Sequence, residues 1–143
     1  MAASRAAVWR ALTDLPRWPV RDRYIQWIQP VGDAPPADGR WWALGRRYRE
    51  QVRRGPFRPV FDLTVVEVDD GRRVAWAAKY LWVRASHAWE VEPRPDGCAL
   101  TSEEVFTGPR VFLAIARVVF RAFAVERMTD RQLEFIAADA RER

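Results

Sequence analysis

The stretch PRVFLAIARVVFRAFAVERMTDRQLEFIAA, from Pro109 to Ala138, decides the fold of this 143-residue chain. Pro109 suits a first helical turn, where its missing N–H would be unpaired anyway. A helix of about 30 residues would be about 45 Å long and would need a large apolar surface to lie on. Its apolar residues recur at intervals of three and four, the spacing of one helix face, at Phe112, Ile115, Val119 and Phe123.

A second helix-start pattern lies inside this stretch. The residues from Thr129 to Gln132 have the pattern of a capping box, in which a Thr and a Gln three positions later satisfy the first N–H groups of a helix. We predict one continuous helix, with a kink or restart at Thr129 as the alternative.

The chain before this helix divides into extended runs separated by turn residues. Asp69-Asp-Gly71 and Pro95-Asp-Gly97 are typical of tight hairpins, because glycine accepts the positive φ that such turns need. Alternation and turn spacing predict antiparallel strands over Tyr24–Val31, Arg40–Val52, Val60–Val68, Arg73–Leu81, Trp82–Glu92 and Cys98–Thr107.

Two short helices are expected at the N-terminus. Ser4 is a good N-cap for a helix that runs to Leu12, and Thr13 starts a second turn that Pro16 and Pro19 keep short. The order of elements predicts an α+β fold in one domain over residues 1–143, with a strongly bent antiparallel sheet wrapped around the long C-terminal helix.

Composition argues against several classes of function. The 24 basic and 19 acidic residues give a net charge of +5, but the basic excess is spread along the chain without a recognition motif, so we expect no specific nucleic-acid partner. A lone Cys98 and a lone His87 make neither a disulfide nor a zinc site. No glycine-rich phosphate loop or nicotinamide fingerprint is present, so no cofactor is expected. Without a leader or a long apolar run, we expect a cytoplasmic protein with no membrane span.

Four segments resemble a known family. They are Ala3–Trp18 (ASRAAVWRALTDLPRW), Ser86–Pro93 (SHAWEVEP), Asp96–Leu100 (DGCAL) and Glu104–Gly108 (EVFTG). Together they resemble the SRPBCC superfamily (START-related, helix-grip), in particular its polyketide cyclase/dehydrase-like branch. The resemblance implies a helix-grip fold with an apolar cavity between sheet and helix. It also implies a strand upstream of Ala3, so we expect the first strand of the family to be missing here. Cys98-Ala99 replace the family's Thr-Arg turn.

Alternation predicts the polar part of a site. His87 shares a strand face with Trp89, and Glu104 shares a face of the next strand with Leu100 and Ser102, so His87 and Glu104 should point inward together. They are candidates for a catalytic acid–base pair. Alternatively, they orient a ligand or hydrogen-bond each other or a Trp indole without chemistry.

The apolar part of the site is predicted from the same faces and from the eight Trp residues. It is either the lining of a ligand cavity or a filled core. The ligand-contacting residues expected, polar ones included, are Trp42, Leu44, Trp76, His87, Trp89, Leu100, Ser102, Glu104, Phe112, Ile115, Val119 and Phe123.

Three functions follow as hypotheses. The first is binding of a small hydrophobic or amphipathic ligand, such as a lipid or polyketide, between sheet and helix. The second is a cyclase or aromatase that uses the same cavity, and the third is a protein-interaction module with a basic face. Fold alone does not choose among them.

Overall fold

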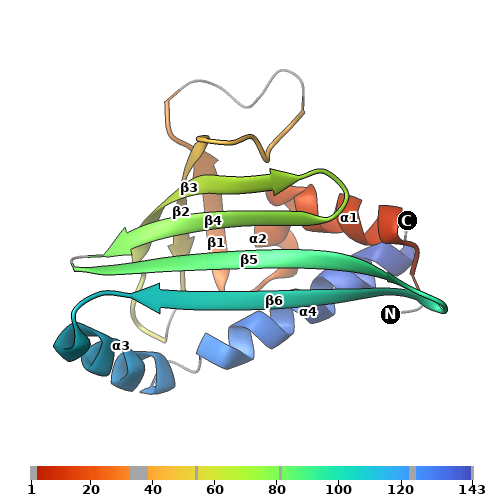
Figure 1. Ribbon diagram of the computed structural model, residues 1–143. Coiled ribbons are helices and arrows are strands. Elements are labelled where there is room, and N and C mark those ends of the chain that lie inside the picture. Colours follow the sequence, from red (N-terminus) through yellow and green to blue (C-terminus); the bar gives the residue numbers. More distant parts are fainter. Residues whose placement is uncertain (1–2, 33–38, 54, 81, 123–124, 143) are drawn as a thin grey trace.

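The computed structural model describes residues 3–32, 39–53, 55–80, 82–122 and 125–142. In this part of the chain, three short helical segments precede six strands and two longer helices (Figure 1). The elements are α1 Arg5–Thr13, η1 Leu15–Arg17, α2 Trp18–Arg21, β1 Ile25–Pro30, β2 Arg47–Val52, β3 Val60–Asp69, β4 Arg73–Tyr80, β5 Val83–Arg94, β6 Gly97–Thr107, α3 Arg110–Ala122 and α4 Val125–Glu142.

The strands form one antiparallel sheet in the order β1-β2-β3-β4-β5-β6. β1 and β2 run steeply across the direction of β4–β6, so the sheet is strongly bent (Figure 1). Register irregularities at Ile25/Trp27 and at Val65/Glu67 add to the bend, because a bulge increases local twist. The predicted α+β fold with a bent antiparallel sheet is confirmed. β1 and β6 are the outer strands of the described sheet, and the strand expected upstream of Ala3 stays a prediction.

The core lies between the sheet and three helical elements. α1, α2 and α4 all lie on the same side of β4–β6, behind them in the view of Figure 1. We call this side of the sheet the inner face. Side chains from both layers are fully removed from solvent there, among them Leu12, Trp18, Val74, Trp89 and Ile136.

A cap stabilises the first N-terminal helix, and ion pairs join the next two helical segments to α4. Ser4 is the N-cap of α1, as predicted, and its side-chain oxygen accepts a hydrogen bond from the Ala7 N–H at 3.2 Å. On α4, the buried carboxylate of Asp139 lies 3.2 Å from Arg21 and 3.5 Å from Arg17. These contacts tie the C-terminal helix to η1 and α2.

The described residues form two helices, α3 ending at Ala122 and α4 beginning at Val125, which run in different directions (Figure 1), so the prediction of one straight C-terminal helix is wrong. Residues 123–124, between them, lie outside the described residues. α4 runs through Thr129 without the restart that was the alternative. Length gives a physical reason, because a straight helix over residues 110–142 would be about 50 Å long. The 12 residues of β5, the longest strand described, span only about 40 Å.

The strand predicted over Arg40–Val52 is also too long, since β2 begins at Arg47. Gly45 adopts a positive φ of 79° and places a turn before the strand. Its N–H donates to the Val65 carbonyl at 2.8 Å, which anchors the turn on β3. Trp41 and Trp42 therefore lie in a loop, although aromatic residues are typical of a strand.

Candidate functional site

Pairing between β5 and β6 puts three polar side chains on the inner face. The register places His87 opposite Glu104 and Trp89 opposite Ser102. Directly opposed residues of an antiparallel pair share a face, and Trp89 is completely buried against the helices. His87, Ser102 and Glu104 therefore all start from the inner face, as predicted.

The hydrogen bond of His87 goes to Ser102. Its Nε2 lies 2.6 Å from the Ser102 hydroxyl oxygen, and its ring stacks on Trp89 with centroids 3.8 Å apart and planes 24° apart. Glu104 is exposed and makes no hydrogen bond or ion pair with His87. His87 thus lies on the predicted face, but its hydrogen-bond partner is the diagonal residue Ser102, not the directly opposite Glu104.

Burial lowers the pKa of His87 from 6.5 to about 4. The imidazole is therefore neutral at neutral pH, with one ring nitrogen that donates and one that accepts. The Ser102 hydroxyl can complement Nε2 in either tautomer, because it can donate or accept. Nδ1 makes no hydrogen bond within the described residues. This nitrogen is therefore chemically able to donate to or accept from another polar group.

Beneath this pair lies a packed cluster of aromatic rings. Trp18 packs edge-on against Trp76 and against Trp89, with centroids 5.5 Å apart in both cases, and Trp42 stacks on Trp76 at 5.1 Å. All four indoles are at most 6% exposed. The predicted aromatic contacts therefore belong to a filled core, the second of the two predicted alternatives; they are Trp42, Trp76 and Trp89. The ring of Trp89 stacks directly against His87.

The indole N–H groups of this cluster are incompletely satisfied. The Nε1 atoms of Trp18, Trp42 and Trp89 are buried and have no hydrogen-bond acceptor within the described residues. Buried donors of this kind are normally paired with protein, water or ligand. Trp18 was not among the predicted site residues, although it ends the N-terminal segment that carries the family resemblance.

The inner face opens toward α3. Along β6, exposure rises from Cys98, which is 1% exposed, through Leu100 and Ser102, which are partly exposed, to Glu104, which is exposed. The opposite end is covered by the residues that lead into α1, where the Cys98 thiol lies 3.4 Å from the Ala3 carbonyl oxygen. The candidate site is therefore the open end of the inner face around His87 and Ser102.

The remaining predicted contacts lie elsewhere. Leu44 is 73% exposed in the loop before β2, so the structure does not support its role as a ligand contact. Ile115 is 55% exposed on α3, whereas Phe112 is partly buried and packs 6.1 Å from Trp82. Phe123 lies outside the described residues, and the side chain of Val119 is not described either, so these two predicted contacts stay predictions.

A separate hollow of about 290 Å³ lies at the other end of the sheet, lined by both signs of charge. The basic side chains that line it already have partners. Arg72 pairs with Glu90 at 3.2 Å, Arg94 pairs with Glu92 at 2.7 Å, and Arg5 donates a hydrogen bond to the Gly71 carbonyl. We assign this hollow no ligand.

Two classes of site have no support in the described residues. No group of three or more His, Cys, Asp or Glu side chains could hold a metal ion there. Neither α3, α4 nor any other described helix has the length and hydropathy to span a bilayer.

The chain belongs to the family described as polyketide cyclase / dehydrase and lipid transport, whose sequence profile matches residues 1–141. This confirms the predicted membership of the SRPBCC superfamily. A comparison with curated proteins gave no match.

Solved structures share the helix-grip fold at low sequence identity. The di-domain ARO/CYC StfQ from the steffimycin pathway superposes with a TM-score of 0.76 at 15% identity, covering 99% of this chain and 48% of StfQ, so this chain spans about half of StfQ. Norcoclaurine synthase from Thalictrum flavum, solved with dopamine and hydroxybenzaldehyde, gives 0.69 at 15%, covering 96% of this chain and 82% of the synthase. Protein NE0264 from Nitrosomonas europaea gives 0.68 at 13%, covering 99% and 90%.

Proposed function

We propose that this domain binds a small hydrophobic or amphipathic ligand, such as a lipid or polyketide, at the open end of the inner face. The proposal rests on the neutral His87, which is hydrogen-bonded to Ser102 and stacked on Trp89. These residues lie where the inner face becomes accessible to solvent. Apolar sites commonly use a few placed polar groups to orient a ligand. The His87–Ser102 pair has this character.

The low pKa of His87 supports binding over proton transfer. A general base works best when its pKa is near the working pH, whereas an imidazole with a pKa of about 4 is a weak base at neutral pH. As a hydrogen-bonding group, a neutral imidazole is versatile, because it can donate to a ligand carbonyl or accept from a ligand hydroxyl. We therefore assign His87 and Ser102 an orienting role.

Cyclase chemistry at the same place is the second candidate. The structural similarity to the di-domain ARO/CYC StfQ and to norcoclaurine synthase supports it at the level of fold. Glu104 would then act as the acid or base, since it is exposed on the same face as His87.

Two measurements test the proposal. Titration with oleate and with a poly-β-ketone analogue, followed by Trp fluorescence, should give saturable quenching, because Trp89 lies directly under His87. Mass spectrometry of the poly-β-ketone sample then detects turnover. Binding without turnover supports a carrier, and cyclised product that disappears in Glu104→Gln supports the cyclase.

Matched variants locate the site. His87→Phe and Ser102→Ala should each weaken binding by about 1 kcal/mol, which is several-fold in affinity, because each removes one buried hydrogen bond. The double variant should be less than additive, since the two side chains form one pair. Ser86→Ala is the control, because Ser86 starts from the outer face one position from His87. Unchanged affinity in both site variants would contradict the proposal.

A further inference from the structure

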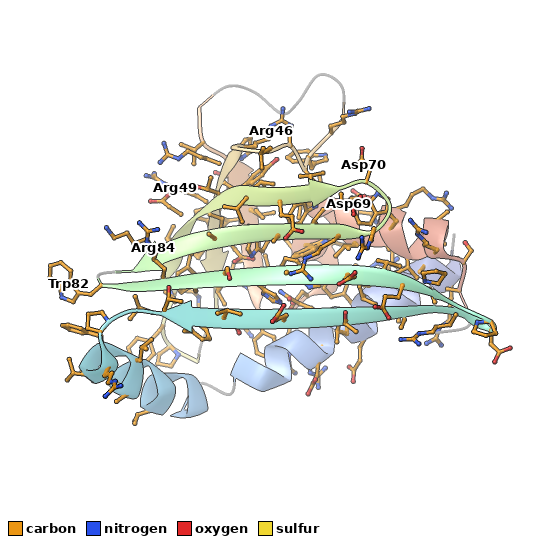
Figure 2. All side chains as sticks on the ribbon, in the orientation of Figure 1. Arg46, Arg49, Asp69, Asp70, Trp82 and Arg84 are labelled. Atoms are coloured by element: carbon orange, nitrogen blue, oxygen red, sulfur yellow. The ribbon has the colours of Figure 1, made fainter. Side chains whose placement is uncertain are left out.

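An apolar surface is left uncovered where the sheet meets α3. Val111, Ile115 and Val118 are 62%, 55% and 70% exposed, and their spacing of four and three residues places them in one stripe along α3. Trp82 is 62% exposed at the tip between β4 and β5, and Figure 2 shows it projecting away from the sheet beside α3. We call these four residues the α3 patch.

The α3 patch is held together as one surface. The ring centroids of Trp82 and Phe112 are 6.1 Å apart, and Phe112 lies on α3 between the exposed Val111 and Ile115. The chain reaches α3 through Gly108, and a Cβ at that position would lie 2.7 Å from the Trp82 carbonyl oxygen. A larger residue at this position would force the two backbones apart, so glycine permits the close approach of the hairpin tip to the start of α3.

Basic residues without counter-charges border the patch. Lys79 and Arg84 are directly opposite each other on β4 and β5, both are exposed on the outer face, and neither forms an ion pair within the described residues. Like charges placed opposite each other are unfavourable unless an anion lies near both. Asp62 on neighbouring β3 is already paired with Arg49 at 2.9 Å. α3 itself, RVFLAIARVVFRA, contains three arginines and no acidic residue.

We propose that the α3 patch docks this protein on the surface of an anionic phospholipid bilayer, with α3 lying in the interface. An apolar helix stripe enters the headgroup region, an exposed Trp is favourable at that depth, and flanking Lys and Arg side chains reach the lipid phosphates. A symmetric contact between two copies through this patch would bring Lys79 and Arg84 of both copies close together, which disfavours a second copy as the occupant.

Vesicle co-sedimentation tests this docking. The protein should sediment with vesicles made of equal parts phosphatidylcholine and phosphatidylglycerol and should remain in the supernatant with phosphatidylcholine alone. Lys79→Gln with Arg84→Gln should lower the partition coefficient roughly thirtyfold at low salt, which corresponds to about 1 kcal/mol for each basic residue near an anionic surface. Val111→Ser with Val118→Ser should lower it at least roughly tenfold, because less apolar surface is buried.

Matched controls separate docking from general charge and hydrophobicity. Arg10→Gln with Arg94→Gln removes the same charge at the far end of the molecule, and Val20→Ser with Val66→Ser removes two other exposed valines. Both controls should sediment as the parent does. The proposal is overturned if neither vesicle binds the parent, if both bind it equally, or if the controls lose as much affinity as the patch variants. It is also overturned if the serine pair instead abolishes a dimer seen by sedimentation equilibrium.

Discussion

The stability of the protein should depend on pH through His87. Its folded-state pKa is lowered from 6.5 to about 4 because burial disfavours the charged imidazole. Between these two values the unfolded chain binds a proton that the folded chain does not. Stability is therefore fully present above about pH 6.5 and is lost as the pH falls toward 4.

The magnitude follows from linkage. Between pH 7 and about pH 5, a shift of this size lowers the free energy of unfolding by about 2 kcal/mol for a fully desolvated group. His87 is partly exposed, so solvent screening reduces the expected loss to about 1 kcal/mol. With an m-value of about 2 kcal/mol/M, the urea midpoint should fall by about 0.5 M.

The assay is urea denaturation of the parent and of His87→Gln at both pH values. The chain has a single histidine, so the variant removes the one imidazole that titrates in this window. The difference between parent and variant isolates its contribution from that of the carboxylates. Equal pH dependence in the two proteins, or a midpoint that rises toward pH 5 in the parent relative to the variant, would refute the reasoning.

Three further predictions concern the frame of the site. Gly108→Ala should lower stability by about 1–3 kcal/mol in urea denaturation, because the new methyl group would meet the Trp82 carbonyl oxygen; an unchanged midpoint would count against the close packing. Asp139→Asn should cost about 1–2 kcal/mol by loss of the contact with Arg21, and the loss should persist in high salt because the carboxylate is buried. Ser4→Ala should cost about 1 kcal/mol by thermal denaturation through loss of the α1 cap, and a neutral result would show that the cap is dispensable.

Features that depend on local chemistry were predicted from the sequence. The turns at Gly71 and Gly97 adopt positive φ values of 77° and 130°, as tight hairpins require, and they connect antiparallel strands where the sequence predicted them. Ser4 caps its helix because an N-cap depends only on the next three residues. The face of His87 followed from the same period-two alternation.

Features set by tertiary contacts were not predictable in this way. The apolar period continues from α3 into α4, so it carries no sign that the two helices run in different directions. Alternation fixes a face but not the rotamer, and stacking on Trp89 directs the His87 ring to the diagonal Ser102. Whether aromatic residues fill a core or line a cavity depends on volumes that periodicity does not encode.

The central claim, that His87 orients a ligand at the open end of the inner face, is tested most directly by NMR of that one histidine. Its ring C–H signals should shift saturably as oleate or the poly-β-ketone analogue is added, with the same dissociation constant that Trp fluorescence gives. In Ser102→Ala the shift should require several-fold more ligand. Saturable binding by fluorescence with no movement of the His87 signals would place the ligand elsewhere and contradict the claim.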